Sequence, residues 1–144
     1  MLFRSIIVTS LALGRALLET GMADYLAMGF VNLTAALPSA MILSAFLLLM
    51  TLMTNIVSNN AAAAIGTPIA IGIAQQLGVS AEPFILATLF GANMSFATPY
   101  GYQTNLLILS AGGYKFSDFL RVGIPLTIIM WIGFSMILPV LYKL

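Results

Sequence analysis

The sequence has no cysteine and no histidine, and only 6% of its residues are charged, against roughly 25% in ordinary soluble domains. Without cysteine the chain has no disulfide, no thiolate metal ligand and no thiol nucleophile. Because histidine is missing too, and the four acidic residues lie near the ends of predicted segments, neither a zinc site nor a nucleophile–base pair is easy to build. The net charge of +1 gives no reason to expect a nucleic-acid partner. The sequence therefore argues against an enzyme and implies no cofactor.

Apolar residues are correspondingly abundant and make up 61% of the chain. Several apolar runs reach or approach the ~20 residues that a helix needs to cross a hydrocarbon core of ~30 Å. Polar and apolar residues nowhere alternate over a sustained stretch, so the pattern favours spanning helices over strands. We therefore predict an all-α integral membrane protein whose surroundings are the lipid bilayer.

Proline, glycine and charged residues divide the chain into five segments. We expect about three transmembrane helices, one of them broken in mid-membrane, and one re-entrant helical hairpin. Arg15 and Glu19 interrupt the first apolar run, which we interpret as a transmembrane helix, with a secretory signal as the alternative. Ser117 is expected to cap the last helix. The predicted segments are a transmembrane helix at 2–18, an interfacial connector at 22–36, a re-entrant hairpin at 38–77 with its tip at 54–60, a broken transmembrane helix at 83–112 and a transmembrane helix at 118–142.

The predicted hairpin combines an oily stretch with a polar tip. No residue from Tyr25 through Ala81 is charged, yet the polar residues Ser58, Asn59 and Asn60 are adjacent in "TNIVSNNAAAAIGTPIA". The preceding apolar run has ~15 residues and would measure ~23 Å as a helix, which is too short to cross the membrane. Two short helices joined by a polar tip predict a hairpin that enters and leaves by the same face. Two ordinary short spans are the alternative.

A second polar break follows in "SFATPYGYQTN", where proline and glycine should interrupt the helix at about 97–103. Broken helices near the membrane midplane are typical of secondary transporters, in which freed carbonyls hold sodium and helix N-termini face anions. The alternative is that such polar groups only join neighbouring helices, commonly for about 0.6 kcal/mol per contact. Two clusters that each occur with helix-breaking residues favour the binding-site interpretation.

These motifs, in this order, resemble the second half of the divalent anion:sodium symporter family, part of the ion transporter superfamily that includes citrate and arsenite carriers. The stretch "PYGYQTNLLILSAGGYKFSDFLRVG" is most similar to the sulfate and dicarboxylate permeases of bacteria and algae. The resemblance covers nearly the whole chain. It implies half of an inverted-repeat transporter fold, in a multi-pass protein of the cell's inner (plasma) membrane. It also implies a small anionic substrate and sodium as the coupling ion.

The resemblance assigns roles to individual residues. The sodium ion would be held, largely through carbonyls, by Thr54, Val57, Asn59 and Gly101. The anion would be contacted by Asn59, Asn60, Tyr102, Gln103 and Asn105, with Ser58, Thr98 and Pro99 in support. Two departures from the family pattern leave the choice between sulfate and a dicarboxylate open. Asn60 stands where threonine is usual, and Tyr102-Gln103-Thr104 stands where dicarboxylate carriers commonly have Thr-Pro-Pro.

Each motif occurs once in these 144 residues, whereas the family has two inverted repeats. We therefore expect a missing N-terminal half or a partner chain, with a homodimer as the alternative. The leading hypothesis is sodium-coupled transport of sulfate or a dicarboxylate, in which this chain supplies one half of the transporter. A second hypothesis is a non-transporting fragment or membrane subunit, and a third is arsenite or sodium/proton transport. Proton exchange usually needs a carboxylate at membrane depth, and none of the four acids lies in a predicted core.

Overall fold

A computed structural model describes residues 2–144, with the side chains of residues 2–7, 10 and 11 left out of the description. Every regular element in this part of the chain is a helix. The helices are α1 (Leu2–Glu19), α2 (Met22–Leu33), α3 (Ser39–Thr54), α4 (Asn59–Leu77), α5 (Glu82–Asn93), α6 (Gln103–Ala111) and α7 (Phe116–Tyr142).

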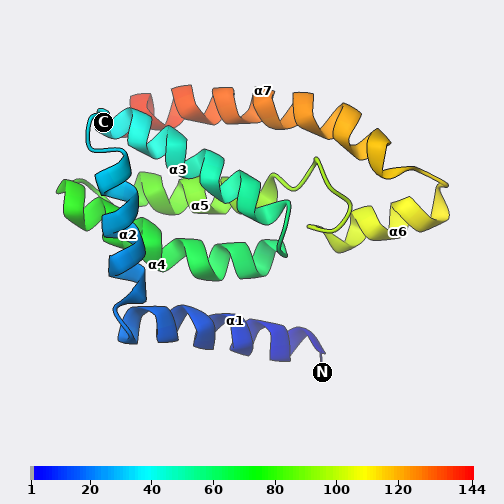
Figure 1. The fold of residues 1–144 in the computed structure, drawn as a ribbon, viewed down its shortest axis with the longest axis horizontal. Coiled ribbons are helices and arrows are strands. Elements are labelled where there is room, and N and C mark those ends of the chain that lie inside the picture. Colours follow the sequence, from blue (N-terminus) through cyan, green and yellow to red (C-terminus); the bar gives the residue numbers. More distant parts are fainter. Residues whose placement is uncertain (1) are drawn as a thin grey trace.

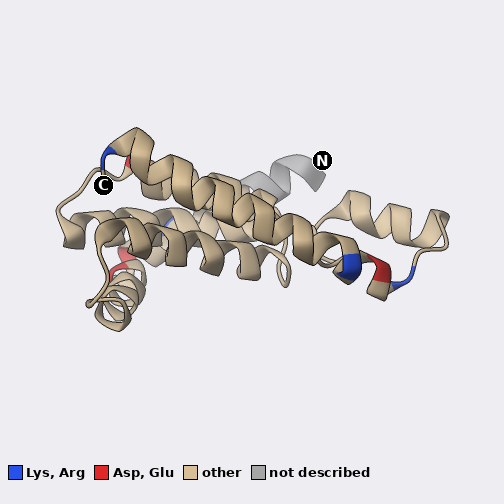
Figure 2. Ribbon diagram, turned by 90° about the horizontal axis from the view of Figure 1, so that it is seen from above, with Lys and Arg blue, Asp and Glu red and all other residues tan. Residues whose placement is uncertain are grey.

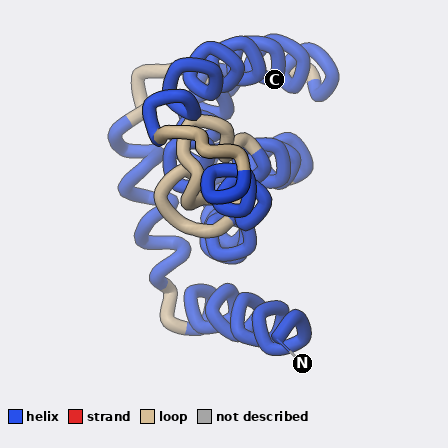
Figure 3. Tube along the Cα trace, turned by 90° about the vertical axis from the view of Figure 1, so that its right-hand side faces the viewer, coloured by secondary structure: helices blue, strands red, loops and turns tan. Residues whose placement is uncertain are grey.

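Most of the helices run along the long axis of the molecule, and α2 crosses them (Figure 1). Helices α3, α4 and α5 lie between α1 on one side and α7 on the other, as the end-on view also shows (Figure 3). Among the residues whose side chains are described, the charged ones lie toward the ends of the bundle (Figure 2). Charged groups at the ends of helices are the arrangement that suits a hydrocarbon environment.

Small residues let α3, α4 and α5 pack closely. Gly66 on α4 and Gly91 on α5 both lie against the Met50 side chain of α3, where a Cβ on either glycine would collide with it. Phe46 and Phe84 are completely buried between α3 and α5, with their rings 6.1 Å apart. These contacts fix α3 and α4 as an antiparallel pair against α5.

The α3–α4 pair covers the segment predicted as a hairpin at 38–77. Pro38 precedes the first residue of α3, where its missing N–H costs no helical hydrogen bond. The Ser58 side chain caps α4 by accepting a hydrogen bond from the Ala61 N–H at 3.3 Å, and Gly78 ends α4 in the left-handed conformation. The residues between the two helices, 55–58, are called the hairpin tip below.

The segment predicted as a broken helix at 83–112 consists of α5 and α6, separated by residues 94–102, here called the broken segment. The helix ends at Asn93, earlier than the predicted break at 97–103. The reason is tertiary, because an asparagine of the hairpin tip binds the backbone of residues 94 and 97. A side chain from a distant part of the chain thus ends α5 before Pro99 could.

The last helix begins at Phe116 rather than at 118, and Ser117 lies inside its first turn, so the expectation that Ser117 caps it was wrong. The cap is Lys115, whose backbone N–H donates to Asp118 Oδ2 at 2.8 Å. Among the described residues, α7 is the one helix that is both long and apolar enough to cross a membrane, with a mean hydropathy of 2.1. Helix α3 is apolar but shorter. The other predicted spans and the re-entrant path of the hairpin therefore stay predictions.

Helix α7 contacts both the hairpin and the broken segment. Gly123 lies directly against the Phe96 carbonyl, and a Cβ there would overlap that oxygen. Nearer the C-terminus, Ser135 and Ser44 of α3 share a hydrogen bond of 2.7 Å, and the Trp131 indole N–H donates to the Ser44 carbonyl at 3.0 Å. The broken segment therefore contacts α7 about 10 Å from the start of that helix at Phe116, and the whole helix is about 40 Å long.

Candidate functional site

The hairpin tip and the broken segment meet at one end of the α3–α4–α5 packing (Figure 1). The Thr98 hydroxyl donates to the Asn55 carbonyl at 2.6 Å, and the Ala97 N–H donates to Asn55 Oδ1 at 3.0 Å. The Asn55 amide in turn donates to the carbonyls of Thr51 at 2.8 Å and Met94 at 3.2 Å. Two polar breaks that are about 40 residues apart in the chain thus form one structure.

Asn59, the first residue of α4, directs its amide into a group of oxygen atoms. The Thr54 hydroxyl donates its single proton to the Ala92 carbonyl at 2.6 Å, so it can only accept from Asn59. With the amide oriented accordingly, Asn59 Nδ2 lies 2.8 Å from Thr54 Oγ1 and 3.1 Å from each of Ser95 Oγ, the Ala92 carbonyl and the Gly101 carbonyl. We call these four oxygens, together with the Asn59 amide, the oxygen ring.

The oxygen ring has the chemistry of a cation site. A half-turn of the Asn59 amide would place Oδ1 where Nδ2 lies, next to the same four oxygens. Of these five oxygens only the Thr54 and Ser95 hydroxyls carry protons, and hard cations prefer ligand sets that are made of oxygen. All five belong to neutral groups: two hydroxyls, two carbonyls and one amide. A neutral set of this kind suits a monovalent ion held largely by dipoles.

Gly101 brings the broken segment into contact with the end of α3. A Cβ at this position would overlap the Thr54 carbonyl oxygen and lie 3.0 Å from the Ser95 Cβ. Only glycine allows the two backbones to approach so closely. The Gly101 carbonyl reaches the oxygen ring because of this approach.

The residues expected to bind sodium are not all in the oxygen ring. Thr54, Asn59 and Gly101 are brought together, whereas Val57 is half-buried in the hairpin tip, with its N–H donating to the Met53 carbonyl at 2.9 Å. Thr54 contributes its hydroxyl to the ring, and its carbonyl lies against Gly101.

The residues expected to bind the anion lie in different surroundings. Asn60, Tyr102 and Gln103 are exposed, and in the described part of the chain their side chains make no hydrogen bond. Asn105 is half-buried, and its amide donates to the carbonyls of Ser95 at 3.0 Å and Thr98 at 3.4 Å. Asn105 therefore supports the broken segment from the α6 side. Pro99 is buried, and Ser58 serves as the cap of α4.

Three residues of this site were missed by sequence reasoning: Asn55, Ala92 and Ser95. Asn55 and Ser95 lie within the polar stretches, so composition alone could have included them. Ala92 contributes a backbone carbonyl, and no side-chain pattern reveals a carbonyl.

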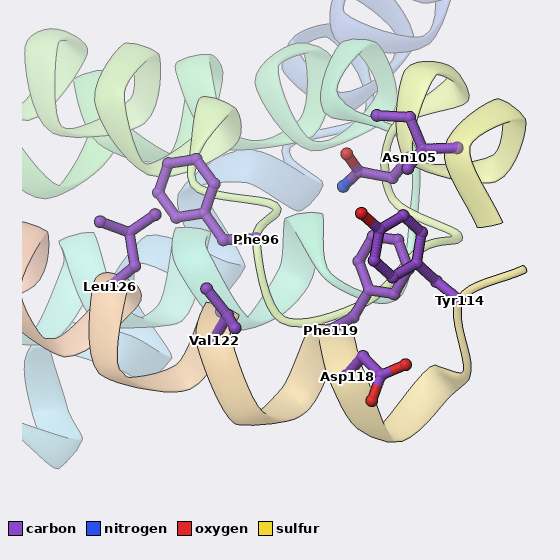
Figure 4. Close-up of a pocket in the computed structure, with 9 residues that line it drawn as sticks. Phe96, Asn105, Tyr114, Asp118, Phe119, Val122 and Leu126 are labelled. Carbon is purple, nitrogen blue, oxygen red and sulfur yellow. The ribbon is translucent and has the colours of Figure 1, made fainter. Parts of the chain in front are cut away.

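A cavity of about 320 Å³ lies beside the broken segment, between it and α7. Asn105 and Tyr114 lie toward one end of this cavity, and Phe96 and Leu126 toward the other (Figure 4). Its walls are mostly apolar, with Phe119 and Val122 completing the α7 side. The cavity is therefore separate in character from the polar oxygen ring.

Comparison with known proteins places this sequence among transporters. The family model described as "Citrate transporter" matches residues 5–143. The chain is 36% identical over 130 residues to an uncharacterized transporter of Synechocystis, and 40% identical over 112 residues to a putative sulfur deprivation response regulator of Chlamydomonas reinhardtii. It is also 32% identical over 133 residues to sodium/sulfate cotransporter 2 of that alga. These matches cover 90%, 78% and 92% of the chain but only 21%, 19% and 15% of the three relatives.

Proposed function

The chain belongs to the citrate transporter family, and from this membership we propose that it supplies one half of a sodium-coupled permease for a divalent anion, either sulfate or a dicarboxylate. The family is one of transporters, so the chain is part of a membrane permease and not an enzyme. The chain spans about a fifth of the length of the first two relatives, which supports a role as one part of a larger transporter.

The oxygen ring around Asn59 is the observation that carries the proposal. Among the residues that the family resemblance assigns to sodium, Thr54 and Gly101 place a hydroxyl and a carbonyl oxygen within 3.1 Å of the Asn59 amide nitrogen. In this proposal the half-turn of the Asn59 amide exchanges an N–H donor for an oxygen ligand when sodium binds. Ser95 and Ala92 then complete the ligand set.

The anion would bind on the outer side of the same ring. Asn60, Tyr102 and Gln103 carry amide and phenol donors, and they are exposed next to the ring. No lysine or arginine lies in the hairpin tip or the broken segment, so a divalent anion would depend on neutral dipoles and on the bound sodium. Coupling follows physically, because the anion binds well only when the cation is present.

The proposal includes the membrane path of the chain. The α3–α4 pair would be a re-entrant hairpin whose tip reaches the interior, and α5 and α6 would be the two halves of one crossing. Support comes from the contact of Gly123 with the broken segment, well inside the span of α7. The protein would be multi-pass in the inner (plasma) membrane, with a second half, on another part of the chain or another chain, opposite the site.

The test is sodium-dependent uptake of sulfate and of succinate by the complete permease that contains this chain. Asn59→Ala removes the amide from the oxygen ring, and uptake should fall at least about tenfold, since losing one polar ligand costs about 1–3 kcal/mol. Asn93→Ala is the matched control, because the Asn93 amide binds only the Leu89 carbonyl of its own helix. Uptake that is unchanged in Asn59→Ala would sink the site assignment.

A further inference from the structure

Asn55 uses every polar atom of its side chain to join the hairpin tip to the broken segment. Its Nδ2 has two protons, and these go to the carbonyls of Thr51 and Met94. Its Oδ1 accepts from the Ala97 N–H, and its backbone carbonyl accepts from the Thr98 hydroxyl. Three of these four hydrogen bonds cross from one polar break to the other.

The bonds of Asn55 enclose Ser95, which is part of the oxygen ring. Met94 precedes Ser95, and Ala97 follows it by two residues. The Asn55 amide therefore hydrogen-bonds the backbone on both sides of Ser95. Ser95 is itself buried, and its Oγ lies 3.1 Å from the Asn59 amide. A shift of the broken segment along Asn55 would therefore move Ser95 and the ring would lose its shape.

We infer that Asn55 is a positioning residue: it holds the broken segment in register with the hairpin tip and thereby sets the affinity of the oxygen ring for sodium. The inference rests on the sodium site proposed above. Asn55 supplies none of the oxygens that lie around the Asn59 amide, and its own amide is held by the backbone of Thr51, Met94 and Ala97. Its effect on sodium must therefore pass through the backbone of residues 94–98.

The first experiment measures the sodium concentration for half-maximal uptake by the complete permease. Asn55→Ala should raise it about tenfold, because the two side-chain hydrogen bonds between the breaks are lost. Maximal uptake at saturating sodium should stay within about twofold of the wild type, since the ring ligands remain.

Thr98→Val removes only the hydrogen bond to the Asn55 carbonyl and should raise the sodium requirement about threefold. The matched control is again Asn93→Ala.

The milder Thr98→Val variant keeps the test decisive if Asn55→Ala does not fold. A sodium requirement equal to that of the wild type in every variant that folds would overturn the inference. So would a fall in maximal uptake without any change in the sodium requirement, since that is the result of a merely structural role.

A second readout needs no transport. Hydrogen exchange of the Ala97 N–H, followed in the detergent-solubilised permease, should accelerate in Asn55→Ala and not in Asn93→Ala. Unchanged exchange would contradict the register on which the inference depends. If wild-type uptake proved independent of sodium, the proposed function would fail by itself, and the exchange measurement would still decide whether Asn55 holds the broken segment.

Discussion

Asn59 and Asn60 are neighbours in the sequence, yet the structure gives them opposite surroundings. The Asn59 amide lies among four oxygens from α3, α5 and the broken segment, within 3.1 Å of each. Asn60 is exposed, as are Tyr102 and Gln103 across the site. The Asn59 amide thus has its partners within this chain, whereas the side chains of Asn60, Tyr102 and Gln103 make no hydrogen bond to any described residue.

Helix geometry explains this difference. Both residues lie in the first turn of α4, where successive side chains point about 100° apart. When Asn59 faces the α3–α5 contact, Asn60 points a little more than a quarter-turn away from it and is exposed. In the proposed function, Asn59 serves the cation and Asn60 serves the anion. The predictions below test whether the two sides can be separated.

The largest effect is expected from Gly101→Ala, which changes the backbone next to the oxygen ring. The added Cβ would overlap the Thr54 carbonyl, so the broken segment must move away and withdraw the Gly101 carbonyl from the oxygen ring. Sodium-dependent uptake should be lost, by about a hundredfold or more, because overpacking of this kind commonly costs 1–3 kcal/mol and here also removes a ligand.

Gly133→Ala is the matched control for this prediction, because a Cβ at Gly133 on α7 meets nothing within 4 Å. Replacing a helical glycine by alanine there should stabilise the protein by roughly 0.5–1 kcal/mol and leave uptake unchanged. If Gly101→Ala transported as well as Gly133→Ala does, the close approach at Gly101 would not be needed for sodium binding.

The helices of this fold could be anticipated from the sequence far better than the contacts between them. Pro38 marks the start of α3, and the polar stretches mark the tip and the broken segment, because local chemistry decides both. The end of α5 at Asn93 could not be read from local chemistry, since Asn55 determines it through bonds to Met94 and Ala97. The start of α7 was placed too late because Asp118 binds the Lys115 N–H from within the helix.

The same limit applies to the candidate site. The family resemblance pointed to Thr54, Asn59 and Gly101, and the fold brings these three residues together. The Ala92 carbonyl could not be found in that way, since every residue has one and only the fold selects it. The sequence also could not show that Asn105 is committed to the carbonyls of Ser95 and Thr98, which leaves its amide engaged within this chain.

A smaller effect, confined to the outer side, is expected from Asn60→Ala. The Asn60 amide makes no hydrogen bond within the described part of this chain, so its removal leaves the oxygen ring intact. The KM for the anion should rise about tenfold, as for one lost hydrogen bond to a charged ligand. The sodium concentration for half-maximal uptake, measured at saturating anion, should not change. An equal rise in both values would mean that the two sides of the tip act as one site.

The smallest effect is expected where polar groups serve packing alone. Ser44 on α3 and Ser135 on α7 share one hydrogen bond of 2.7 Å, far along the helices from the hairpin tip. In a membrane such a bond is commonly worth about 0.6 kcal/mol, so a double-mutant cycle of Ser44→Ala and Ser135→Ala should give a coupling energy of that size in thermal or denaturant unfolding.

The sodium requirement should be the same in both serine variants as in the wild type, because neither serine contacts the tip or the broken segment. Chemically, the serine pair and the ring pair Thr54–Asn59 are alike: each is a short hydrogen bond between neutral side chains. What distinguishes them is the number of further oxygens at hand, since Ala92, Ser95 and Gly101 surround the ring pair. A sodium requirement that rose in Ser135→Ala would show that α7 transmits its packing to the ring, and the separation between packing and binding would fail.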